Sequence, residues 1–167
     1  METTEQSIQS AIVLCGFALA HATWSVSNGE TLCTMAVTEC RADQELIRFE
    51  SDSIPDSIEN AREHLIGLQG DIDRWALVFD GYITIKTEKK DALIIQAWSK
   101  QGETPLRIIQ AYQTKALFQR FKILGAPRFV DKSGAQFENL TYQQWMLDGI
   151  AQHPKVAGLW EKWYRGI

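Results

Sequence analysis

The ten residues Ala11–Ala20, AIVLCGFALA, are all apolar or small, and this run constrains the fold more than any other feature of the chain. A membrane span needs about 20 mostly apolar residues, whereas Gln9 and Ser10 precede this run and His21 follows it. A secretory signal needs basic residues ahead of its apolar run, but the first Lys or Arg is Arg41. We therefore interpret the run as a helix enclosed by the protein's own core, and we expect a cytoplasmic location with no membrane partner.

The apolar positions recur at three- and four-residue steps from about Thr4 to Trp24, which predicts a helix over these residues. Its middle is apolar on all sides, as in a helix that is covered on most faces. Gly16, together with Ala18 and Ala20, would let another backbone approach closely. The helix is expected to stop before Gly29.

The next segments alternate between extended and helical patterns. Leu32–Glu39 and Glu45–Glu50 are predicted to form a β-hairpin. A helical stripe follows over residues 54–68, with Asp52 or Ser53 as its cap and Pro55 in its first turn. This stripe is the clearest helix signal in the chain.

From Trp75 onward the pattern is extended and predicts a β-meander. The strand candidates are Trp75–Phe79, Tyr82–Thr87, Ala92–Trp98 and Leu106–Tyr112. Residues 88–90 are the predicted turn between the second and third candidates. Asp80 and Gly81 predict either a two-residue turn or a bulge inside one long strand.

Residues 115–130 suit a short helix or an edge strand over Arg120–Leu124, and the pattern slightly favours the strand. Two closing helices are expected, one beginning at Thr141 and one near Pro154. Together these elements predict one α+β domain over residues 1–167. Its mainly antiparallel sheet is a meander of about five to seven strands, packed against a buried N-terminal helix, a middle helix and two C-terminal helices.

The formal charge of −4 conceals two segments of opposite sign. Residues 41–83 contain ten acidic and four basic residues, whereas residues 84–132 contain ten basic and four acidic ones. Aromatic residues lie among the cations of the basic segment 84–132: Tyr82 just precedes it, and Trp98 and Tyr112 lie within it. A sheet face with aromatics beside cations would suit single-stranded nucleic acid. The acidic chain as a whole does not favour nucleic acid as a partner.

No recognised catalytic, cofactor or metal-binding motif is present in the sequence. His21, His64 and His153 are far apart along the chain, and each has a structural explanation at a helix boundary or surface. The three cysteines lack the Cys-x-x-Cys spacing of zinc and redox sites and are interpreted as buried thiols in a reducing compartment. The sequence therefore assigns no catalytic residue, cofactor or metal site, and it leaves open whether the protein is an enzyme.

Three aromatic residues near the C-terminus, Trp160, Trp163 and Tyr164, share one side of the last predicted helix and are the candidate partner-binding residues. Docking of this helix onto the protein's own sheet is the competing interpretation. The leading hypothesis is a non-catalytic protein-binding or regulatory domain whose partner is a second copy or another protein. The alternatives are a small-molecule-binding protein or enzyme with a pocket between the sheet and the first helix, and a single-stranded nucleic-acid-binding protein that uses the basic segment 84–132.

Overall fold

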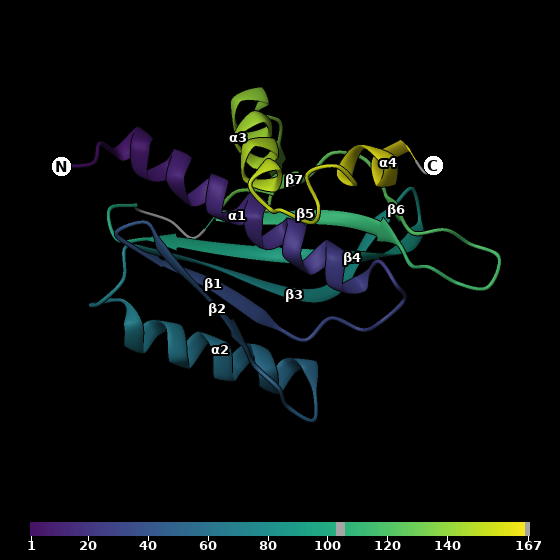
Figure 1. Ribbon diagram of the computed structural model, residues 1–167, viewed down its shortest axis with the longest axis horizontal. Coiled ribbons are helices and arrows are strands. Elements are labelled where there is room, and N and C mark those ends of the chain that lie inside the picture. Colours follow the sequence, from purple (N-terminus) through teal and green to yellow (C-terminus); the bar gives the residue numbers. More distant parts are fainter. Residues whose placement is uncertain (103–105, 166–167) are drawn as a thin grey trace.

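A single antiparallel sheet carries the fold, and the computed structural model describes it for residues 1–102 and 106–165. Its strands lie in the order β2-β1-β3-β4-β5-β7-β8, and β6 pairs with β5 (Figure 1). The strands are Met35–Cys40 (β1), Asp43–Arg48 (β2), Arg74–Ile85 (β3), Glu88–Ser99 (β4), Leu106–Gln113 (β5), Lys122–Ile123 (β6), Arg128–Val130 (β7) and Gln136–Phe137 (β8). The predicted α+β class is confirmed. The described sheet has eight strands, whereas the sequence predicted about five to seven. The strands β6, β7 and β8 are too short to give a period-two pattern in the sequence.

The meander reverses direction at a different place from the predicted one. Lys86 and Thr87 have φ values of 47° and 69°, as in a two-residue type I′ turn, and Glu88 already pairs with Ile85. The turn predicted at residues 88–90 is therefore wrong by two residues. The β1–β2 hairpin turns in the same way, with positive φ at both residues 41 and 42.

Gly81 is neither a turn nor a bulge, because β3 continues through it in unbroken register with β4. A Cβ atom at Gly81 would lie 2.6 Å from Cδ1 of Ile94. The glycine therefore makes room for a neighbouring side chain across the strand pair. Both readings of Asp80 and Gly81 are replaced by one strand of 12 residues.

Helix α1, Thr4–Val26, crosses one face of the sheet, where it packs on β3 and β4. Thr3 and Gln6 form a capping box at its start, with the Gln6 amide donating to Oγ1 of Thr3 at 3.2 Å. By length and composition α1 is the one described helix that could cross a membrane, but its middle is buried among the sheet and α3, as in a core helix. The predicted buried N-terminal helix is confirmed.

Helix α3, Leu140–Ala151, packs against α1 with the two backbones almost in contact. A Cβ atom on Gly149 would lie 2.0 Å from the carbonyl oxygen of Val13, and one on Gly16 would lie 2.2 Å from that of Met146. The close approach predicted at Gly16 is therefore present, and Gly149 is its partner. Asn139 caps α3 in place of the expected Thr141, because the Asn139 side chain accepts from the Tyr142 amide.

The opposite face of the sheet carries α2, Ile54–Leu68, as Figure 1 shows. Ser53 is its cap, and Ala61 and Leu65 are its buried apolar residues. This helix agrees with its sequence prediction at both ends.

Helix α4, Trp160–Arg165, begins later than the predicted start near Pro154. The chain from His153 to Leu159 runs through hydrogen-bonded turns, and Val156 is fully buried within them. Because this burial holds the segment against the core, the helix starts only at Trp160.

Candidate functional site

A cavity of about 320 Å³ lies between the first turns of α1, the end of β4 and the β7–α3 region. We call it the N-terminal cavity. Its wall is mainly apolar and includes Ile8, Ala11, Ala97, Phe137 and Tyr142. Ligand-binding pockets in proteins commonly have volumes of 300–1,000 Å³, so the size suits a small molecule. An alternative hypothesis from the sequence included a pocket between the sheet and the first helix but named none of its residues.

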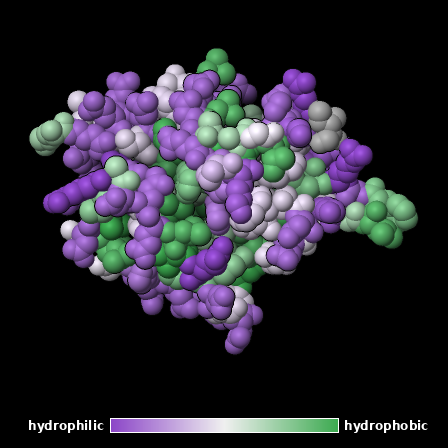
Figure 2. Space-filling model, viewed as in Figure 1, coloured by the Kyte–Doolittle hydropathy of each residue, from purple (hydrophilic) through white to green (hydrophobic). Residues whose placement is uncertain are grey.

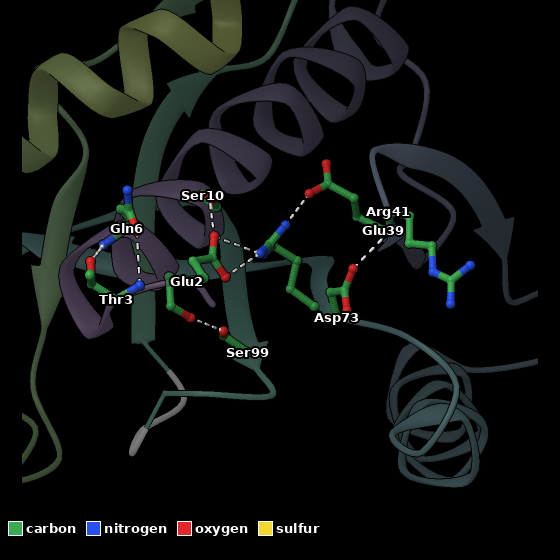
Figure 3. Close-up of polar contacts among 10 residues, drawn as sticks. Glu2, Thr3, Gln6, Ser10, Glu39, Arg41, Asp73 and Ser99 are labelled. Carbon is green, nitrogen blue, oxygen red and sulfur yellow. Dashed lines mark hydrogen bonds and ion pairs between the residues drawn. The ribbon is translucent and has the colours of Figure 1, made fainter.

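The N-terminal cavity has a buried hydroxyl group in its otherwise apolar wall. Ser99 lines the cavity, and its Oγ is hydrogen-bonded to Oγ of Ser7, which is itself fully buried (Figure 3). Ser99 offers the cavity its O–H hydrogen when Ser7 is the donor of the pair, and a lone pair when Ser99 is the donor. A polar group on a bound molecule therefore has a partner at this end of the cavity.

Asp131 and Lys132 lie at the exposed rim of the cavity. Oδ1 of Asp131 accepts hydrogen bonds from the Ser133 hydroxyl at 2.6 Å and from the amides of Ser133 and Ala135. These bonds, that of the Ser133 hydroxyl first, lower the pKa of Asp131 below its usual value. Asp131 therefore holds the β7–β8 turn, whereas Lys132 makes no ion pair within the described part of the chain and can face an anionic group.

A buried ion-pair cluster holds the start of α1 in place beside this cavity. Figure 3 shows the carboxylates of Glu2 and Glu39 on either side of one guanidinium, which belongs to Arg74. Arg74 is only 7% exposed and donates both to Glu2, at 2.9 and 3.1 Å, and to Glu39. Ser10 of α1 donates to the same Glu2 carboxylate at 3.0 Å. The cluster therefore links the chain end, α1 and the sheet.

His21 and His153, 132 residues apart, meet where α1 passes the end of α3, a contact that sequence reasoning missed. Nδ1 of His153 accepts from the Lys155 amide at 3.3 Å, so its proton is on Nε2, which donates to Nδ1 of His21 at 3.1 Å. His21 then carries its own proton on Nε2, a buried atom without a partner among the described residues. Both rings are therefore neutral. A proton added to Nδ1 of His21 would face the Nε2–H group of His153, and one added to Nδ1 of His153 would face the Lys155 amide.

The surroundings of this histidine pair disfavour positive charge. Burial lowers the pKa of both rings, and the His153 ring and the cations of Arg48 and Lys155 lower that of His21 further. Lys155 also adds to the lowering at His153, and its Nζ lies 4.5 Å from the ring centre of Trp24. The pair is a neutral structural contact near neutral pH, and it charges only under acidic conditions.

We expect acidification to destabilise the protein through this pair. The folded-state pKa values lie below the unfolded value of 6.5, so the unfolded chain takes up the protons first. The pair's contribution to the free energy of unfolding is therefore present above the unfolded value of 6.5 and is lost as the pH falls from there through the lower folded-state pKa values.

Urea unfolding of the wild type and of the double variant H21Q/H153Q, at several pH values between neutral and mildly acidic, measures this effect. The double variant should lose most of the wild-type pH dependence, whereas the exposed-site control His64→Gln should keep it. An identical pH dependence in wild type and double variant would contradict the assignment.

Two further displaced pKa values belong to a half-buried carboxyl group and a buried thiol. Burial raises the pKa of Asp80, whose Oδ1 accepts from the Tyr112 hydroxyl at 2.9 Å, and burial raises the pKa of the Cys15 thiol to about 12. Cys15 is therefore an inert thiol near neutral pH. The described residues contain no group of three or more His, Cys, Asp or Glu side chains that could hold a metal ion.

The candidate partner-binding residues lie in different environments. Trp160 is 8% exposed and belongs to the main core, and Trp163 packs edge-on against the ring of Phe121. Tyr164 is 48% exposed and lies beside exposed Leu147 in a hollow of about 210 Å³. Docking of the last helix onto the protein's own core thus accounts for the two tryptophans, and partner binding by these residues stays a prediction that rests mainly on Tyr164.

The aromatic residues in and beside the basic segment 84–132 do not share one face. Tyr82 and Tyr112 line a hollow on the α1 side of the sheet, whereas Trp98 stacks on Trp75 next to the cluster under α2. Trp98 therefore lies apart from the two tyrosines, and nucleic-acid binding by the basic segment stays a prediction.

Comparison of the chain with protein-family models, with curated proteins and with solved structures finds no match. The proposals below therefore depend on the cavities, contacts and charges of this chain alone.

Proposed function

We propose that the protein binds a small, mainly apolar molecule in the N-terminal cavity. The cavity of about 320 Å³ between α1 and the sheet is the observation that carries the proposal. It corresponds to the volume of about ten water molecules in the liquid. Transfer of a ligand's apolar surface from water to such a wall supplies the main driving force for binding.

The polar groups of the cavity favour a ligand with one polar end. The Ser99 hydroxyl lies in the wall, and the Lys132 ammonium lies at the rim. A short carboxylate or alcohol with an apolar body matches this arrangement, because buried polar groups of a ligand need hydrogen-bond partners. The function is thus binding or carriage of a small amphipathic molecule, and no chemical step is included in the proposal.

This function replaces protein binding as the leading proposal. The protein-binding hypothesis named Trp160, Trp163 and Tyr164, and the two tryptophans make contacts within the chain, which leaves Tyr164 as its main support. The pocket hypothesis, in contrast, is supported by a cavity in the expected region of the fold.

Octanoate and octanol serve as probes in thermal unfolding and calorimetric titration. At a concentration one hundred times its Kd, a ligand that prefers the folded state stabilises it by about 2.7 kcal/mol. For a chain of this size the Tm should then rise by roughly 5–10 °C.

A variant that fills the cavity should lose this response. Ala11→Met extends a side chain from α1 into the cavity space, whereas Ala151→Met makes the same change at an exposed position in α3. Ala11→Met should bind at least tenfold more weakly, and Ala151→Met should bind like the wild type. Equal binding by all three proteins, or no binding of either probe to the wild type, would rule out an amphipathic ligand at this cavity.

A further inference from the structure

The segment between β5 and β6 forms a narrow hairpin whose tip is apolar. The amide of Ala116 donates to the carbonyl of Gln119 at 2.9 Å, and the reverse bond is 3.1 Å, so Leu117 and Phe118 are the two tip residues. Their exposed fractions are 89% and 97%. Figure 1 places this hairpin beyond the edge of the sheet, and Figure 2 shows an apolar lobe projecting there.

Side-chain hydrogen bonds hold the hairpin in this projecting form. Nε2 of Gln119 donates to the carbonyl of Thr114 at 2.7 Å, and Nε2 of Gln113 donates to that of Arg120 at 2.7 Å. The tip is therefore fixed away from the protein's own core, although burial of Leu117 and Phe118 would be favourable in water. An ordered apolar projection of this kind is typical of an interaction site.

Basic residues surround the tip. Lys115 and Arg120 are exposed on its two sides, and Lys122 follows in β6. Behind the tip lies a hollow of about 610 Å³, lined by Lys89, Lys90, Arg128 and, from the hairpin itself, Gln119. The apolar tip and the basic hollow are thus one continuous surface, which we call the hairpin surface.

The acidic groups of this region are already engaged. Asp91, which also lines the hollow, accepts from the Thr114 hydroxyl at 2.9 Å, and Glu88 pairs with Lys90 at 2.8 Å. The six basic residues of this region, Lys89, Lys90, Lys115, Arg120, Lys122 and Arg128, outnumber these two acidic ones, so the hairpin surface has a net positive charge although the chain as a whole has a charge of −4.

We propose that the hairpin surface docks on an anionic lipid membrane, with Leu117 and Phe118 inserted among the lipids and the surrounding cations facing the headgroup phosphates. A convex tip with two projecting apolar side chains has no groove of its own, and a bilayer accepts such side chains without a preformed pocket. Cations behind the apolar residues complement the negative potential of a phosphatidylserine-containing surface.

This contact is peripheral, so it differs from the membrane span that the sequence excluded. The expectation of no membrane partner depended on the lack of a spanning segment, and nothing in the sequence identified Leu117 and Phe118 as a hairpin tip. The docking is independent of the N-terminal cavity, because the two surfaces share no residue.

Co-sedimentation with phosphatidylcholine vesicles, with and without phosphatidylserine, tests the proposal on the full chain. The wild type should bind the phosphatidylserine vesicles and should bind more weakly as salt is raised. The double variant L117S/F118S should bind at least tenfold more weakly. Ile66→Ser, at a 64% exposed apolar position in α2, is the matched control and should bind like the wild type.

The charge variant K115Q/R120Q separates the two parts of the surface. Each cation near an anionic membrane contributes roughly fivefold in affinity, so this variant should bind roughly 25-fold more weakly. Because all these positions are exposed, circular dichroism should show that each variant folds like the wild type.

Two results would overturn the proposal. One is the absence of wild-type binding to phosphatidylserine vesicles, and in that case concentration-dependent light scattering that disappears in L117S/F118S would assign the tip to a second copy of the chain. The other is unchanged vesicle binding by L117S/F118S, which would show that the apolar tip does not insert.

Discussion

Gly149→Ala should lower the free energy of unfolding by about 3 kcal/mol or more, because a methyl group has no space where α3 meets α1. The added Cβ would lie 2.0 Å from the Val13 carbonyl oxygen and 2.9 Å from the Phe17 amide nitrogen. Both are backbone atoms, so no side chain can rotate away, and the helices must separate. Separation would also open the core around Met146 and Ile150, which are buried at this contact. Urea unfolding followed by circular dichroism measures the change.

Gly67→Ala is the matched control, and its effect should have the opposite sign. Gly67 is an exposed residue inside α2, and a Cβ there would meet nothing within 4 Å. Alanine in a helix interior is favoured over glycine by up to about 1 kcal/mol. If Gly149→Ala cost no more than an ordinary surface substitution, the backbone contact between α1 and α3 would be wrong.

Arg74→Ala should lower the free energy of unfolding by about 3–5 kcal/mol. The substitution removes the cation between Glu2 and Glu39, whose side chains are 26% and 15% exposed. Two partly buried carboxylates would then lie without their counter-ion, and removal of one member of a buried ion pair costs far more than the pair contributes when intact. The same urea unfolding experiment measures the loss.

Arg41→Ala is the control for this substitution. Only the backbone amide of Arg41 is engaged, by Asp73 at 2.8 Å, and Figure 3 shows its side chain extending away from that contact. Its effect should be within about 0.5 kcal/mol of zero. Arg74→Lys should be intermediate, because an ammonium keeps the charge but not the fork of donors that reaches both carboxylates. Equal stability of Arg74→Ala and Arg41→Ala would show that the ion-pair cluster does not stabilise the fold.

Elements defined by local patterns could be predicted from the sequence. Helix α2 has its cap, Ser53, and its apolar stripe within 16 residues, so no distant contact is needed to locate it. Helix α1 was recognised by the same periodicity, and its uniformly apolar middle correctly predicted enclosure on several sides.

Elements defined by distant partners could not be predicted in this way. Asp80 and Gly81 are residue types typical of turns. Only the pairing with β4, where the Ile94 side chain fills the space beside Gly81, shows that the glycine lies inside β3. The start of α4 depends likewise on burial of Val156 against a core that no short window of sequence contains.

The candidate site shows the same division. A pocket between the sheet and the first helix was an alternative hypothesis from the sequence, but the Ser7–Ser99 pair joins residues 92 positions apart, and neither serine has a distinctive sequence context. The His21–His153 contact is hidden for the same reason. Leu117 fell in the segment that suited a short helix or an edge strand over Arg120–Leu124, and its exposure depends on hairpin bonds that the pattern does not reveal.

Methyl-group NMR during titration with octanoate is the most direct test of ligand binding in the N-terminal cavity. The proposal predicts saturable shifts of the methyl signals of Ile8, Ile12 and Val130, which line the cavity, while those of exposed Ile54 and Ile66 in α2 stay unchanged. Shifts that do not saturate, or that are equal for the cavity and α2 methyl groups, would contradict it.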